Sequence, residues 1–311
     1  MAITASMVKE LREMTGAGMM DCKKALNETN GDMEAAVEFL RKNGQAKAEK
    51  KASRIAAEGL SKVIVKDDKV AALVEVNSET DFVAKNEKFQ NFVSQVAEQV
   101  LASDAADMDA FMAETWNADS SMTVQEALVA QIAVIGENLK IRRFEKVTAE
   151  NGCVVSYTHA GGRIGVVIEA DTAVVNDAVK EALTNIAMQV AALNPKYVSQ
   201  ADVSEDIIAH EKEILFAQIM NDPKESQKPE KVIQGMIAGR VNKEMKEVCL
   251  LSQVYVKAED GKQSVDAYLK AVSKEVGADV TVKKFVRFET GEGIEKKEED
   301  FAAEVAAQMG N

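Results

Sequence analysis

The chain has 311 residues, of which 46% are hydrophobic and 29% charged, and its formal net charge at neutral pH is -13. This length accommodates about two domains, and the composition is that of an ordinary globular protein rather than a disordered one. The acidic balance argues against a general affinity for the phosphate backbones of nucleic acids, which requires clustered Lys and Arg, although it leaves room for a local basic patch.

Three cysteines, Cys22, Cys153 and Cys249, lie far apart in the sequence and are odd in number. Neither a CxxC pair nor a Cys/His spacing typical of zinc occurs, so we expect buried free thiols in a reducing compartment rather than disulfides or a metal site. The amino-terminal residues lack the apolar run of a signal peptide, and no segment reaches the roughly 18 apolar residues of a membrane-spanning helix. We therefore expect a cytoplasmic protein that does not associate with membranes.

Residues 1–45 predict three short helices. The glycines in TGAG (residues 15–18) end the first helix, because glycine adopts backbone angles that other residues avoid. Asp32 can cap the third helix, and Asn43-Gly44 is expected to stop it. A bundle this small typically binds another protein, because its own core is tiny. A basic linker, KAEKKASR (residues 47–54), follows it.

A β-hairpin and two helices are predicted for the next part of the chain. Strand-like runs at residues 59–66 and 69–78 are separated by two aspartates, which predicts the hairpin. Apolar residues at helical spacing predict an amphipathic helix over residues 89–100. A polar, alanine-rich segment, residues 102–122, predicts a loop or a weak helix, and residues 122–147 predict a helix that runs into a strand.

A second α/β unit follows, and a helical pair interrupts it. Its predicted parts are strands at 153–159 and 163–171, a helix at 176–193, the run VCLLSQVYVK (248–257), a helix at 265–276 and a strand at 281–289. The interruption consists of two helices with apolar stripes, joined by a tip with two prolines at 222–230, and predicts a projecting antiparallel hairpin. The tail predicts a short helix with Phe301, Val305 and Met309 on one side.

The sequence offers no group of residues suited to covalent chemistry. It contains no phosphate-binding loop, and the glycines of residues 160–165 lack the spacing of a dinucleotide fingerprint and predict a tight turn instead. His159 and His210 are too few for a metal cluster; His210 is expected to be solvated, and His159 reads as a polar turn residue for which a contact role is open. We therefore expect no cofactor and no metal site.

The basic linker is the one candidate for nucleic-acid binding. Its charges are Lys47, Lys50, Lys51 and Arg54. It lacks the interleaved aromatic residues that single-strand binding usually uses, so a solvated linker is the favoured interpretation. Direct nucleic-acid binding is therefore not expected.

The stretch EVNSETDFVAKNEKF (residues 75–89) allows two interpretations of Phe82. A helix that begins at Asp81 would place Phe82 and Phe89 in one core stripe, and the pattern alone favours this interpretation. Lys85 and Asn86, however, are a natural break and cap, so the helix can begin at Asn86 instead. In that case Phe82 lies on a turn, where a large aromatic side chain is explained by binding.

Two segments resemble the signature sequences of the elongation factor Ts family, the bacterial guanine-nucleotide exchange factors for elongation factor Tu. They are LREMTGAGMMDCKKAL (residues 11–26) and EVNSETDFVAK (residues 75–85). The likeness extends to IGENLKIRR (135–143), HAGGRIGV (159–166) and RFETGEGIEKKEEDFAAEVAA (287–307), and so covers nearly the whole chain.

The resemblance implies an α+β fold made of an amino-terminal three-helix module, a core of two α/β subdomains with antiparallel sheets, an inserted helical hairpin and a carboxy-terminal helix. The expected domains are 1–55 for the partner-binding module with its basic linker, 56–150 for the first core subdomain, 151–198 with 246–293 for the second, 199–245 for the hairpin and 294–311 for the carboxy-terminal module. The resemblance also raises the question whether two copies pair through the hairpin.

The resemblance also implies a function and the residues that perform it. The chain would bind elongation factor Tu and promote GDP release, with Asp81 and Phe82 inserted near the magnesium and nucleotide site of the partner. Supporting contacts are expected from Thr80, Val83, Met19, Met20 and His159. No covalent step is needed, because a partner that prefers the nucleotide-free state weakens GDP binding by the same factor.

Two other functions stay open at this point. The first is an adaptor or scaffold that binds elongation factor Tu without accelerating exchange. The second is a translation factor that binds RNA through the basic linker at residues 47–54.

Overall fold

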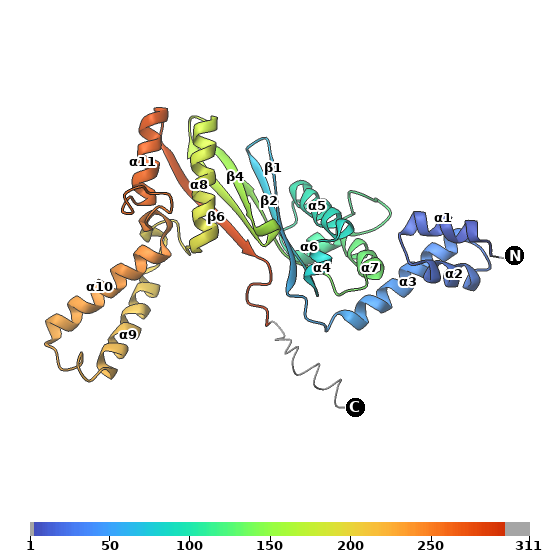
Figure 1. The fold of residues 1–311 in the computed structure, drawn as a ribbon, viewed down its shortest axis with the longest axis horizontal. Coiled ribbons are helices and arrows are strands. Elements are labelled where there is room, and N and C mark those ends of the chain that lie inside the picture. The colour runs from blue at the N-terminus through green and yellow to red at the C-terminus, as the bar shows by residue number, and fades with distance from the viewer. Residues whose placement is uncertain (1–2, 296–311) are drawn as a thin grey trace.

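The computed structural model describes residues 3–295 and shows an elongated molecule (Figure 1). Two small antiparallel sheets stand in the middle, a three-helix module lies at one end, and a helical hairpin projects from the other. The α+β fold class expected from the sequence is confirmed. No helix within residues 3–295 is both long and apolar enough to span a membrane.

The amino-terminal module consists of α1 (Ala5–Thr15), α2 (Met19–Glu28) and α3 (Met33–Lys51). Asp32 caps α3 as predicted, since its carboxylate accepts the backbone N–H of Ala35. The predicted stop at Asn43-Gly44 is wrong, and residues 47–51 of the predicted linker are helical, because α3 continues to Lys51. Gly44 and Ala48 are buried on the continuing helix, and Gly44 faces α7. Packing against α7 therefore outweighs the local helix-ending signal.

The first sheet has the order β1-β2-β3, made of β1 (Glu58–Lys66), β2 (Val70–Ser78) and β3 (Lys140–Thr148). The hairpin turn places Asp67 and Asp68 in the left-handed region, at φ 55° and 53°, as a tight two-residue turn requires. The helices that follow β2 are α4 (Asp81–Ala84), α5 (Glu87–Ala102), α6 (Met108–Ala113) and α7 (Val124–Ile135). Helix α5 buries Phe89 and Phe92 against this sheet.

The second sheet has the order β4-β5-β6, made of β4 (Cys153–His159), β5 (Ile164–Thr172) and β6 (Val280–Glu289). Helices α8 (Asp177–Leu193) and α11 (Val265–Val276) pack on it. A short turn, η1 (Ala160–Gly162), joins the first two of its strands. Cys22, Cys153 and Cys249 are all free and buried, which confirms the prediction made from their number and spacing.

The two sheets pack face to face through a shared apolar layer that includes Leu73, Val154 and Val167. A Cβ atom at Gly165 would lie only 2.7 Å from the Leu73 side chain, so glycine permits this close approach. The helices of each unit therefore cover the outer face of its own sheet, as Figure 1 shows.

The projecting hairpin consists of α9 (Glu205–Asn221) and α10 (Glu230–Val248). Short turns, η2 (Gln200–Asp202) and η3 (Leu250–Ser252), flank it. The run VCLLSQVYVK forms η3 and isolated bridges rather than a strand of the sheet. The predicted carboxy-terminal helix, with Phe301, Val305 and Met309, lies outside the described residues.

Candidate functional site

Phe82 lies on a single helical turn, α4, that directly follows β2. Asn86 ends this turn and caps α5, where its side chain accepts the backbone N–H of Lys88 at 2.9 Å. The interruption rotates Phe82 out of the stripe that buries Phe89, and the Phe82 ring is 80% exposed. The interpretation of Phe82 as a core residue is therefore wrong, although its helical start at Asp81 is correct.

Asp81 sits beside Phe82 in the first turn of α4 and forms an exposed ion pair. The Lys85 ammonium lies 2.6 Å from its carboxylate. The hydrogen bond from Lys85 lowers the pKa of Asp81, and solvent surrounds both side chains. Asp81 therefore carries a negative charge at neutral pH and presents it next to an exposed aromatic ring.

Thr80 and Val83 anchor α4 to the rest of the fold. The Thr80 hydroxyl accepts the backbone N–H of Val83 at 3.4 Å and so caps α4. Val83 is half-buried against the core between α5 and the first sheet. Both residues therefore support the projection of Phe82, and the contacts with a partner expected from them stay a prediction.

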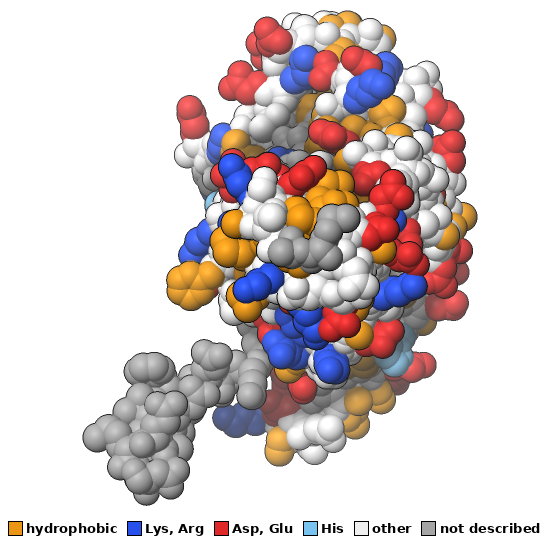
Figure 2. Space-filling model, turned by 90° about the vertical axis from the view of Figure 1, so that its right-hand side faces the viewer, with side chains coloured by type: hydrophobic (Ala, Val, Ile, Leu, Met, Phe, Trp, Pro, Cys, Tyr) orange, Lys and Arg blue, Asp and Glu red, His pale blue; other side chains and the backbone are white. Residues whose placement is uncertain are grey.

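Methionines gather near the loop between α1 and α2. Met14, Met19 and Met20 are 63%, 60% and 74% exposed, and we call these three residues the methionine patch. Figure 2 looks onto the end of the molecule that carries α1–α3 and shows hydrophobic side chains among charges of both signs. Methionine suits a contact surface, because its side chain is flexible and polarizable.

His159 lies at the end of β4, in the second sheet, next to the turn η1. It is exposed, and its Nδ1 lies 2.9 Å from the Tyr157 hydroxyl. The structure thus places it on a different sheet from β2, which leads to Phe82. His210 is also exposed, on α9, as predicted.

The basic segment at residues 47–54 is largely engaged by neighbouring groups. Lys47 pairs with Asp21 at 2.9 Å, and Arg54 lies 3.4 Å from Glu79. Lys51 donates to the carbonyl of Gly136. Three of its four cations, Lys47, Lys51 and Arg54, therefore have partners within the chain.

Clusters suited to metal binding were sought throughout residues 3–295. In that part of the chain no three His, Cys, Asp or Glu side chains are grouped so that they could hold an ion. The candidate contact groups are the exposed Phe82 ring, the Asp81 carboxylate and the methionine patch.

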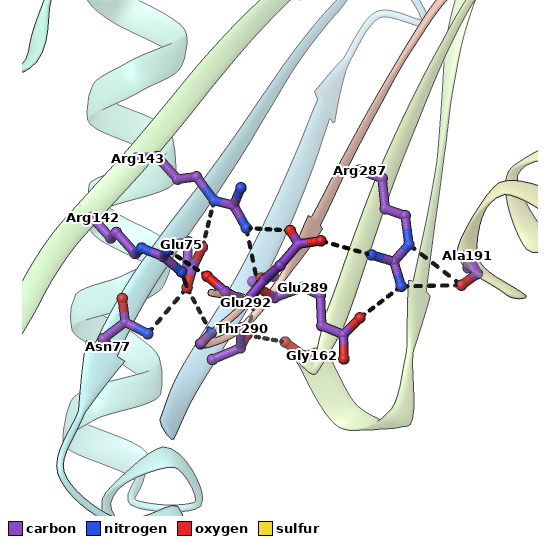
Figure 3. Close-up of polar contacts among 12 residues, drawn as sticks. Glu75, Asn77, Arg142, Arg143, Gly162, Ala191, Arg287, Glu289, Thr290 and Glu292 are labelled. Carbon is purple, nitrogen blue, oxygen red and sulfur yellow. Dashed lines mark hydrogen bonds and ion pairs between the residues drawn. The ribbon is translucent and has the colours of Figure 1, made fainter. Parts of the chain in front are cut away.

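Glu75, a residue of β2 for which no role was predicted, is the centre of a buried polar network (Figure 3). Its side chain is fully buried, and its carboxylate accepts from Arg142 at 2.9 Å, from Arg143 at 2.5 Å and from the Gly291 backbone N–H at 2.8 Å. Burial raises the pKa of Glu75, but the Gly291 hydrogen bond and the two guanidinium groups outweigh it, so the pKa is lowered overall.

The network joins the two sheets. Arg143, on β3, also donates to the carbonyl of Glu289, the last residue of β6, at 3.1 Å and pairs with Glu292, in the turn beyond β6, at 3.2 Å (Figure 3). Arg287, on β6 itself, pairs with Glu289 at 2.8 Å. The segment that follows β6 is therefore held against β2, the strand that precedes Phe82.

Glu137, between α7 and β3, is the second residue without a role in the sequence interpretation. It contacts the segment ahead of α4, which lies more than fifty positions earlier in the chain. The motif IGENLKIRR includes Glu137, but no local signal in the sequence shows which residues its carboxylate meets.

A family model and full-length relatives share one name. A family model described as Elongation factor TS matches residues 79–292. Over 308 residues the chain is 52% identical to Elongation factor Ts of Clostridium novyi (strain NT), covering 99% of both chains. Over 315 residues it is 50% identical to Elongation factor Ts of Trichlorobacter lovleyi, covering 100% of this chain and 99% of that protein.

Proposed function

The chain belongs to the elongation factor Ts family, and from this premise we propose that it binds elongation factor Tu in the GDP-bound form and accelerates the release of GDP. The observation that carries the proposal is Phe82, a large aromatic ring that is 80% exposed on a short, well-supported turn. A ring this exposed contributes little buried area to the fold, and burial in a partner would make it a hot spot of the interface.

The mechanism needs binding energy rather than a reacting group. If the chain binds nucleotide-free elongation factor Tu more tightly than the GDP complex, it weakens GDP binding by the same factor. A ring buried in the partner contributes about 2–4 kcal/mol when it is a hot spot. Part of that free energy offsets the binding free energy that the partner loses when its contacts with GDP are broken.

Asp81 has a second role in this proposal. Its charged carboxylate would enter beside Phe82, close to the magnesium ion and phosphates of the partner. A bound cation is the largest local charge in such a site, so a new negative charge beside it alters how tightly the ion and the phosphates are held. The methionine patch and His159 would add contact area at some distance from the nucleotide.

The proposal predicts a difference between two affinities. The chain should bind nucleotide-free elongation factor Tu more tightly than the GDP complex, by the same factor by which it weakens GDP binding. Isothermal titration with both forms of the partner measures that factor. Equal affinity for both forms would indicate an adaptor that binds without driving exchange.

Replacing Met19 and Met20 together with serine is expected to raise the dissociation constant for elongation factor Tu about tenfold, because loss of one or two kcal/mol of contact energy has this effect. Both side chains are exposed, so the melting temperature should change little. Met220→Ser, an exposed methionine on α9, is the matched control and should leave the affinity unchanged. Equal affinity of the double variant and the wild type would contradict a contact role for Met19 and Met20.

We also propose the hairpin as the surface through which two copies would pair. Phe216, Met220 and Val232 are 49%, 45% and 46% exposed on its two helices. Exposed apolar side chains of this kind mark contact surfaces. Sedimentation at several concentrations tests this, since Phe216→Ser should shift a dimer toward the monomer, and a monomer at every concentration contradicts it.

A further inference from the structure

A glutamate clamp holds the backbone immediately ahead of α4. One oxygen of Glu137 accepts the backbone N–H groups of Glu79 and Thr80, both at 3.0 Å. The other oxygen accepts the Thr80 hydroxyl at 2.7 Å. Three donors thus converge on one carboxylate, and such charge-assisted hydrogen bonds are stronger than bonds between neutral groups.

The contact is reciprocal. The Glu79 carboxylate accepts the backbone N–H of Asn138 at 2.5 Å, so each loop holds the backbone of the other. Arg54, just beyond α3, lies 3.4 Å from the same Glu79 carboxylate, and its carbonyl accepts from the Asn138 side chain at 2.7 Å. The clamp therefore also reaches the end of the helix that carries the amino-terminal module.

Helix α4 depends on outside support, because it is only four residues long. One turn of helix is unstable by itself, since nucleation fixes many backbone angles for a single hydrogen bond. Thr80 caps the turn, because its hydroxyl oxygen accepts the backbone N–H of Val83. The same hydroxyl donates a hydrogen bond to Glu137, which orients its lone pairs toward Val83. The direction in which Phe82 projects is thus linked to the Glu137 carboxylate.

We propose that Glu137 is a positioning residue for Phe82: it fixes the ring for insertion into the partner without contacting the partner itself. The inference rests on the proposed exchange function and deepens it. It assigns the loop between α7 and β3 a role in exchange that acts entirely through α4.

The test is a double-mutant cycle on GDP release from elongation factor Tu, with the full chain. Glu137→Ala should lower the rate at saturation about tenfold, because a misplaced group loses much of its effect. Glu137→Gln should lose less, since its carbonyl can still accept both N–H groups. In the Phe82→Ala background, Glu137→Ala should change the rate less than about twofold, because the ring that it positions is absent.

Hydrogen exchange in the free chain gives a readout that does not depend on the partner. The amides of Glu79 and Thr80 should exchange faster in Glu137→Ala, while the amides of the core strand β2 keep their protection. Glu98→Ala, an exposed glutamate on α5, is the matched control and should match the wild type in both experiments.

Two results would overturn the inference. One is wild-type exchange by Glu137→Ala. The other is an undiminished further loss in the Phe82→Ala background, which would mean that Glu137 acts on something other than the ring. A wild-type chain that leaves GDP release unchanged defeats the proposed function itself, and because the wild type is measured in the same series, that failure is distinguished from failure of the clamp.

Discussion

Replacing Phe82 with alanine is expected to slow GDP release from elongation factor Tu by about 30-fold or more at a saturating concentration of the chain. The expected loss follows from the roughly 2–4 kcal/mol that a hot-spot aromatic contributes, since about 1.4 kcal/mol corresponds to a factor of ten in rate. The fold should be unaffected, because the ring is 80% exposed and makes little contact with the core. Stopped-flow release of a fluorescent GDP analogue measures the rate, and thermal unfolding checks the fold.

Two further variants show whether the ring acts as an inserted aromatic. Phe82→Leu retains much of the apolar volume and should fall between the wild type and Phe82→Ala. Phe216→Ala removes another exposed phenylalanine, which lies on α9 and is 49% exposed, and should leave the release rate unchanged. Near-normal release by Phe82→Ala would contradict the inserted ring.

Replacing Glu75 with alanine should lower the free energy of unfolding by about 3–5 kcal/mol, the scale observed when one partner of a buried ion pair is removed. The carboxylate is fully buried, and its loss leaves the Gly291 N–H without its acceptor and removes the carboxylate partner that Arg142 and Arg143 share. Urea unfolding monitored by circular dichroism measures the change. Glu98→Ala, on the exposed face of α5, should stay within about 0.5 kcal/mol of the wild type.

The same carboxylate should make stability depend on pH. The pKa of Glu75 is lower in the folded chain than the usual value of about 4.3 in an unfolded chain. A lowered pKa stabilises the fold fully above the unfolded value, and the contribution is lost as the pH falls through the folded value.

The stability difference between the wild type and Glu75→Gln should therefore be constant above about pH 5 and shrink as the pH falls below about 4.3. Unfolding in urea over this range measures it. A difference that does not change with pH would show that Glu75 acts through its shape rather than its charge.

Local patterns predicted most of the elements, because they depend on spacing and end signals. The stripe over residues 89–100 appears as α5, and the turn at Asp67-Asp68 appears as the hairpin between β1 and β2. The predicted helix end at Asn43-Gly44 was wrong, because α3 is stabilised there by contacts with α7, whose residues are distant in the sequence. The sequence left open whether Phe82 is buried or exposed, because it carries signals for a helix start at Asp81 and for a cap at Asn86. The structure contains both, and the second signal turns Phe82 outward.

The supporting residues of the candidate site could not be predicted from pattern. Glu75 lies in a strand among apolar residues, where a charged side chain reads as solvent-facing, yet its partners Arg142, Arg143 and Gly291 come from distant segments. Glu137 follows a helix end and looks like an ordinary loop residue. Its partners at Glu79 and Thr80 become neighbours only when β2 and β3 pair in one sheet.

The most direct test of the central claim is the rate at which fluorescent GDP leaves elongation factor Tu as the concentration of this chain increases. We predict that the rate rises with concentration to a plateau far above spontaneous release, because the chain stabilises the nucleotide-free partner. A stable complex between the two proteins that releases GDP no faster than elongation factor Tu alone would contradict the account.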